Sequence, residues 1–256
     1  MQKLGRRGLH DHVVREIGER IIRGELEPGQ PLPKEAILVK TLGVSRTALR
    51  EALRVLAAKG LLEATPKVGT IVRPPANWNY LDPDVFAWRL DSEQVGQAVA
   101  ELNQLRHNIE PLAASLAATN ATRQDIASLK SAYADMESAG DNGAAFLDPD
   151  VRFHRGIIAA TGNALFATLG IIIGAALEVF FRLEIGHPEF YISALTLHKA
   201  VLDAICARDP KAARLAMRKL IEDAERDAQR IRNWKLRTAR ATRLSGGVAR
   251  RARRQP

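Results

Sequence analysis

The stretch that decides the fold is "GVSRTALREALRVLAAKGLLEATPKVGTIV", residues 43–72. Ser45 stands where a helix N-cap is expected, because its hydroxyl can accept a hydrogen bond from the first helical turn. The apolar residues that follow recur at helical spacing and predict one buried stripe: Leu49, Ala52, Leu53 and Leu56. Arg46, Thr47, Arg50 and Arg54 are predicted on another face. The helix therefore combines a buried side with an exposed basic side.

The residues around this helix predict a winged helix-turn-helix. "LPKEAILVKTLG" just before it predicts a short helix that ends at Gly43. The second helix of such a pair can enter the DNA major groove, where arginine reads guanine O6 and N7. After Gly60, "LLEA" and "TIVR" flank the turn "TPKVG", a hairpin whose tip carries Lys67 and Gly69. We expect residues 1–75 to bind double-stranded DNA. Arginines on a merely solvated helix face are the alternative.

The distribution of charge supports a polyanionic partner at the ends of the chain. The formal net charge is +9. Residues 1–76 have 14 Lys/Arg against 8 Asp/Glu, residues 77–229 have 14 against 21, and residues 230–256 have 10 against none. A basic head, an acidic middle and a basic tail predict that only the ends meet DNA. The tail, residues 237–256, is expected to be disordered, and a solubility role is its alternative.

The composition excludes several classes of protein. No run of about 18 apolar residues predicts a membrane span, and no signal peptide is recognised at the start. A single cysteine, Cys206, excludes an internal disulfide and fits a reducing cytoplasm. We therefore expect a cytoplasmic protein without a membrane partner.

The second half of the chain is predicted to be all α. "RPPANWNYLDPD" has three prolines and no periodicity, so residues 76–90 are expected to be a linker or strap. Apolar residues in 95–121 follow a 3.6-residue period, and further helical segments follow near 122–139, 144–161, 163–185, 190–207 and 210–236. The fold class is therefore mainly α. A winged helix-turn-helix is followed by an antiparallel bundle of six or seven helices over residues 91–236.

The first 75 residues resemble the GntR family of bacterial transcription regulators. "IIRGELEPGQPLPKEAIL", "GVSRTALREALRVLAAKGLLE" and "GTIV" follow the order and spacing of that family. The resemblance implies that the recognition helix contacts an operator through Ser45, Arg46, Thr47 and Arg50. The wing would contact it through Lys67 and Gly69. Ala36 departs from the family pattern, since many members have arginine there, so operator sequence or affinity is expected to differ.

The helical domain resembles the FadR-type branch with an FCD ligand-binding domain. "ELNQLRHNIEPLAASLAA", "DPDVRFHRGIIAATGN" and "LHKAVLDAI" carry this likeness, and "NWNYLDPDVFAW" resembles regulators of sugar-acid catabolism, galactonate regulators among them. This resemblance implies a homodimeric repressor with a small carboxylate effector. Arg106 would clamp the carboxylate with its planar guanidinium. An i,i+4 pair with Glu110 is the alternative role of Arg106.

Three side chains suggest a metal centre. Asp150 and His154 are four residues apart and so share one helix face, and His198 lies on a later apolar helix. One carboxylate and two imidazoles suit Zn²⁺, with Ni²⁺ or Mn²⁺ as other choices. A surface Asp/His pair and an ordinary core histidine are the structural alternatives. By resemblance, Leu220 stands where full sites have a further histidine, so open positions would face water or the effector. His107 and His187 are expected to be surface residues without partners.

Two other functions fit parts of this pattern. An open metal site also describes a metal-dependent hydrolase or lyase, although no general-base motif accompanies it and such an enzyme has no use for a DNA-binding head. An architectural DNA-binding protein without an effector is the other alternative. We expect a regulator rather than an enzyme.

Overall fold

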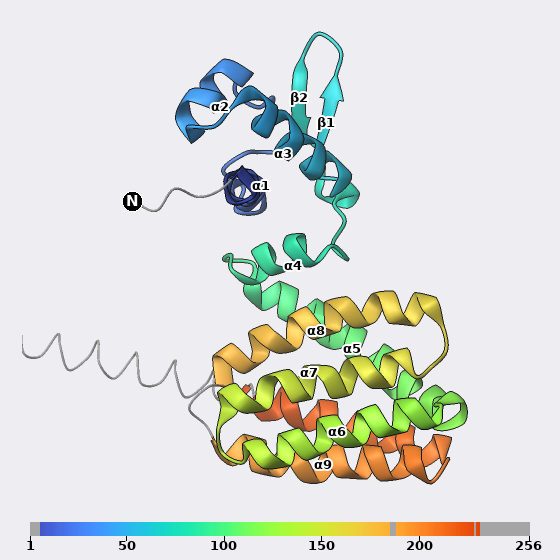
Figure 1. Ribbon diagram of the computed structural model, residues 1–256. Coiled ribbons are helices and arrows are strands. Elements are labelled where there is room, and N and C mark those ends of the chain that lie inside the picture. Colours follow the sequence, from blue (N-terminus) through green and yellow to red (C-terminus); the bar gives the residue numbers. More distant parts are fainter. Residues whose placement is uncertain (1–5, 185–187, 228, 231–256) are drawn as a thin grey trace, which may run out of the picture. The chain divides into compact units, whose positions relative to one another are not determined.

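Helices α2 (Glu35–Leu42) and α3 (Arg46–Ala58) form the expected helix-turn-helix in the computed structural model (Figure 1). Gly43 ends α2 in the left-handed conformation, at φ 65°, which costs glycine little because it has no Cβ. Ser45 then begins α3, and its Oγ accepts a hydrogen bond from the backbone N–H of Ala48 at 3.2 Å. The predicted N-cap and turn are therefore confirmed.

The structure describes residues 6–184, 188–227, 229 and 230. The chain divides into two compact units, Met1–Glu101 and Leu102–Pro256, and the division falls within helix α5 (Val95–Asn120). The basic tail and His187 lie outside the described residues.

The first unit is built around α3. Helix α1 (Arg6–Ile22) packs along α3, and strands β1 (Leu62–Thr65) and β2 (Gly69–Val72) follow as an antiparallel hairpin. The register pairs Leu62 with Val72 and Thr65 with Gly69. Of the predicted stripe on α3, Leu49, Ala52 and Leu56 are buried, and Leu53 is partly buried against the same core. The predicted hairpin wing is present.

Residues 76–90 contain regular structure. A 3₁₀ turn (Pro75–Asn77) leads to helix α4 (Pro83–Leu90), which packs on α1 within the first unit. Trp78, Val85 and Trp88 join the core of that unit. The aromatic and apolar side chains of residues 76–90 thus anchor this segment to the first unit. The prolines explain why the first half of the segment shows no periodicity in sequence.

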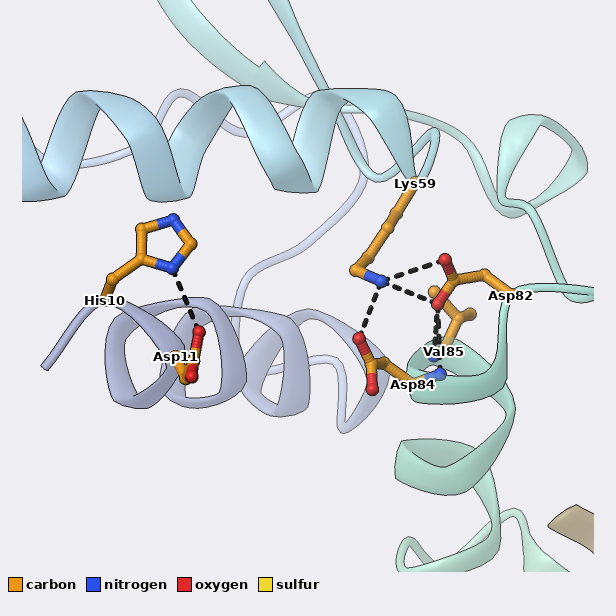
Figure 2. A network of polar contacts seen from close by, with 6 residues as sticks. All are labelled: His10, Asp11, Lys59, Asp82, Asp84 and Val85. Atoms are coloured by element: carbon orange, nitrogen blue, oxygen red, sulfur yellow. Dashed lines mark hydrogen bonds and ion pairs between the residues drawn. The ribbon is translucent and has the colours of Figure 1, made fainter. Parts of the chain in front are cut away.

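A buried lysine joins the end of α3 to the start of α4 (Figure 2). Nζ of Lys59 donates to both carboxylate oxygens of Asp82, at 2.8 and 2.9 Å, and to Oδ2 of Asp84 at 2.7 Å. Asp82 is also the N-cap of α4, with Oδ1 accepting from the N–H groups of Asp84 and Val85. Two carboxylates therefore offset both the desolvation of the lysine and its position near a positive helix end.

The second unit is a helical bundle. Helix α7 (Gly143–Ala159) packs between α6 (Arg123–Ala139) and α8 (Ala164–Glu184), and α9 (Pro188–Cys206) packs on α6 and α7 (Figure 1). A last helix over residues 210–227 completes the described part. The mainly α fold class is confirmed. Within the described residues, none of the helices has the length and apolar character needed to span a bilayer.

Candidate functional site

The exposed face of α3 carries the predicted DNA-contacting residues. Arg46, Thr47 and Arg50 are all exposed, while the opposite face of the helix is fully buried. The N-cap at Ser45 fixes where the helix begins, so Arg46 occupies its first turn. These residues therefore form one polar surface on a helix whose orientation is set by its core contacts.

The hairpin tip is also exposed. Lys67 has φ 65° and Gly69 has φ 107°, so the turn from Thr65 to Gly69 uses two left-handed residues. Glycine tolerates its conformation without strain, whereas lysine there is uncommon. The tight turn therefore presents an exposed cation and exposed backbone at the tip of the hairpin. In Figure 1 the hairpin projects from the first unit beside α3.

The structure brings Asp150, His154 and His198 together in the bundle core. Asp150 and His154 come from one face of α7, and His198 comes from α9. All three are nearly fully buried, and their ligand atoms lie within 4.8 Å of one another. Oδ1 of Asp150 is 2.8 Å from Nε2 of His198 and 3.8 Å from Nε2 of His154. The alternative of a surface Asp/His pair is therefore wrong.

Hydrogen bonds orient both imidazole rings. Nδ1 of His154 donates to Oε2 of Glu110 at 2.5 Å, and Nδ1 of His198 donates to the carbonyl oxygen of Ala194 at 2.8 Å. Carboxylate and carbonyl oxygens only accept, so each Nδ1 has the hydrogen. In a neutral ring Nε2 is then unprotonated and faces Asp150. An Nδ1 bond to a carboxylate or carbonyl is the usual support for a metal-binding histidine.

Two buried atoms at the centre fit a cation. Oδ2 of Asp150 and Nε2 of His198 have no hydrogen-bond partner among the described residues. Buried polar atoms normally have one, and an unpaired buried carboxylate oxygen is costly. Phe153 lies with its ring centroid 5.3 Å from that of His198, so an apolar wall keeps the centre in a low-dielectric setting. The donor set and its unpaired atoms therefore fit a divalent metal.

The charges of the cluster depend on one another. Burial would raise the pKa of Asp150, but His154, His198 and Arg106 outweigh it and lower that pKa. Burial likewise opposes charge on His154, and Glu110 and Asp150 outweigh it and raise the pKa of His154. The centre therefore favours a positive charge between the carboxylates. A metal cation held by Asp150, His154 and His198 would supply that charge in place of a proton.

Glu110 was missed as a member of this site. Sequence reasoning placed it only as a helical partner of Arg106. That pair is present, with Nε of Arg106 2.5 Å from Oε1 of Glu110. The other carboxylate oxygen contacts His154, and both residues of the pair are buried. Burial would raise the pKa of Glu110, but Arg106 and His154 lower it to about 2. The i,i+4 spacing of Arg106 and Glu110 is visible in the sequence. The contact of Glu110 with His154 on α7 is not, because it depends on how α5 and α7 lie in the fold.

Two further expectations concern residues outside this cluster. The expectation that His107 has no partner is wrong. Its Nε2 lies 2.9 Å from Oε2 of Glu225. This contact joins α5 to the last helix, and sequence spacing could not reveal it. Leu220 is 3% exposed and belongs to the same apolar core that surrounds the cluster.

Comparison with known proteins identifies both units. The family model described as bacterial regulatory proteins, gntR family, matches residues 9–72, and the FCD domain model matches residues 101–223. The galactonate operon transcriptional repressor of Escherichia coli (strain K12) is 34% identical over 86% of this chain and 97% of its own length. The chain belongs to the GntR family. It is a transcription regulator of the type with an FCD domain, not an enzyme.

Another relative and a solved structure also match most of the chain. The transcriptional repressor NanR of Cronobacter sakazakii is 32% identical over 84% of this chain and 83% of its own. Among solved structures, Streptococcus agalactiae GntR is 26% identical, covers 85% of this chain with 99% of its own, and has a TM-score of 0.50. The hydrolase or lyase alternative is therefore set aside.

Proposed function

We propose that this GntR-family regulator is a homodimeric repressor that a small carboxylate releases from operator DNA. The proposed class of carboxylate is a sugar acid. The name of the galactonate operon repressor supports the sugar-acid class, and its alignment spans nearly the whole chain. The observation that carries the proposal is the buried Asp150/His154/His198 cluster, in which Oδ2 of Asp150 and Nε2 of His198 have no hydrogen-bond partner among the described residues. Its place of action is the cytoplasm, where bacterial operators are found.

The DNA contacts are assigned to the exposed residues of the first unit. Ser45 sets the start of α3, Arg46, Thr47 and Arg50 face the major groove, and Lys67 and Gly69 of the wing reach the adjacent backbone or minor groove. Two such units in a dimer would address the two halves of a pseudo-palindrome. In domain terms, residues 1–75 bind DNA, 76–90 act as a strap and 91–236 bind effector and dimerise. Residues 237–256 form a basic tail.

The effector is assigned to the metal centre. Asp150, His154 and His198 would hold Zn²⁺, or Ni²⁺ or Mn²⁺, with Leu220 contributing no ligand. When bound, such a cation offers open Lewis-acid positions to the carboxylate and hydroxyl oxygens of a 2-hydroxy acid. Arg106 would pair with the same carboxylate. Within the same helix, Nε of Arg106 also donates to Oε1 of Glu110.

Release requires a difference in affinity between two states. An effector shifts the regulator off DNA only if it binds more tightly to the arrangement that fits the operator poorly. The chemistry of the site thus decides which ligand binds. The difference in ligand affinity between the two states decides how far the affinity for the operator falls. The two can be measured separately.

The test uses an operator duplex that the purified protein selects from a random DNA library. Fluorescence anisotropy then follows its release by a panel of sugar acids, galactonate included, with Zn²⁺ present or removed by a chelator. We expect one sugar acid to release the duplex only with metal present. Absence of any release or thermal shift across the panel would contradict the effector assignment and favour an architectural DNA-binding role.

A further inference from the structure

The three arginines along α3 are held in different ways. Arg46 forms no ion pair with any residue that the structure describes. Arg54 contacts its own helix, with Nη1 2.6 Å from Oε1 of Glu51. Arg50 reaches the other helix of the motif, and its Nε donates to Oε2 of Glu35 at 3.2 Å. Among the described residues, Arg50 is thus the one arginine of the three whose side chain forms an ion pair with α2.

The atom used in that contact matters for base recognition. A guanidinium has five N–H donors in a fixed plane, and two of them can bind guanine O6 and N7 together. Glu35 engages Nε of Arg50, which leaves both terminal amino groups, Nη1 and Nη2, outside the contact. Arg54, in contrast, commits a terminal amino group to Glu51. The bond to Glu35 thus orients Arg50 without occupying the end of its fork.

Glu35 is well placed to hold that orientation. It is the first residue of α2, so its backbone is fixed by the helix-turn-helix itself. Its side chain is 34% exposed, whereas that of Arg50 is 65% exposed. A long exposed arginine loses conformational freedom when DNA fixes it, and a partner that already restrains it reduces this loss. An exposed ion pair adds little to folding stability, so its effect should appear in binding.

We propose that Glu35 is a specificity-determining residue, which positions Arg50 through Nε so that Nη1 and Nη2 meet one guanine of the operator. This inference rests on the proposed DNA contact of Arg50. A carboxylate near DNA also repels phosphates, and that effect alone would weaken binding to every sequence equally. The two roles predict opposite results when the charge is removed.

The first experiment separates positioning from repulsion. Fluorescence anisotropy measures binding of the full chain to a duplex that it selects from a random library and to a scrambled duplex. Glu35→Ala should lower the selected-to-scrambled affinity ratio by roughly 3- to 10-fold, the range for ordering one long side chain. Glu35→Gln should retain more of the ratio, because its amide oxygen still accepts from Nε. Glu51→Ala, a matched control on α3, should change both affinities equally.

The second experiment uses Arg50 itself. Arg50→Ala should lower the same ratio, and single base-pair changes in the selected duplex should locate the lost preference at a guanine. Glu35→Ala should weaken discrimination at that guanine and add nothing in the Arg50→Ala protein. An unchanged ratio in Arg50→Ala would contradict the proposed DNA contact. A lowered ratio there, with Glu35→Ala strengthening binding to both duplexes alike, would show that Glu35 only repels and overturn the inference.

Discussion

Nε2 of His198 lies 2.8 Å from Oδ1 of Asp150, yet Nε2 has no hydrogen-bond partner among the described residues. With Nδ1 donating to Ala194, a neutral ring presents a bare lone pair to a carboxylate oxygen. Two such atoms repel unless a cation lies with them. A proton would give an imidazolium ion, and a metal would use both atoms as ligands.

Removal of one imidazole should abolish metal binding. In His198→Ala only Asp150 and His154 remain, too few protein ligands for a stable site. Calorimetric titration with Zn²⁺ should show micromolar or tighter binding by the wild-type protein and none by the variant, while far-ultraviolet dichroism stays helical. If wild-type protein takes up no divalent metal, the cluster is not a metal site and the effector must be held by Arg106 and hydrogen bonds.

Loss of the carboxylate behind His154 should weaken the metal site without removing a ligand. Glu110→Gln keeps the size of the side chain but loses its charge, so Nδ1 of His154 has a poorer acceptor. Supporting groups of this kind typically contribute about 10- to 100-fold in metal affinity. Competition with a chromophoric chelator measures the change. A matched control is Glu225→Gln, which alters the exposed partner of His107 and should leave metal affinity unchanged.

Addition of an imidazole at residue 220 should strengthen metal binding. Leu220 lies in the core around the cluster, and Leu220→His would offer a further nitrogen ligand. We expect Zn²⁺ affinity to rise at least about tenfold, equal to about 1.4 kcal/mol. If the effector uses that position, operator release should require more of it. Equal metal affinity in the two proteins would place residue 220 out of reach of the cation.

Arg106 should be needed for the effector response and not for DNA binding. Arg106→Ala would remove one of the two ion-pair partners of the buried carboxylate of Glu110, a costly change. Arg106→Lys keeps the positive charge but lacks the planar fork, and is the sharper variant. It should bind the selected duplex normally and need at least about tenfold more sugar acid for release. Release at the wild-type concentration would exclude the clamp.

Lys59 should stabilise the first unit. Lys59→Met keeps the aliphatic length but leaves Asp82 and Asp84 without their shared cation. The site is partly exposed, so we expect a loss of about 1–2 kcal/mol in the free energy of unfolding. Urea unfolding followed by tryptophan fluorescence reports on this unit in a Trp234→Phe background, because Trp78 and Trp88 belong to its core. Lys40→Met, at an exposed position on α2, should change little.

The sequence by itself determined the helix-turn-helix. Its signals are local: a capping serine, a glycine at a helix end, apolar residues at helical spacing and a short turn between two strands. Each acts within a few residues of the chain, so the pattern of α2, α3 and the wing follows from neighbours in sequence. The pairing of Asp150 with His154 is equally local, since both lie on one face of α7.

Contacts between distant segments were decided only by the tertiary structure. The i,i+4 spacing showed that Arg106 and Glu110 could pair, but not that Glu110 reaches His154, 44 residues away. The partners of Lys59 and His107 also lie on other helices. Periodicity identifies which face of a helix is buried, whereas the packing of α5 against α7 decides what that face meets. A buried carboxylate can be a pair, a ligand or a support for one, and only its neighbours in space distinguish these roles.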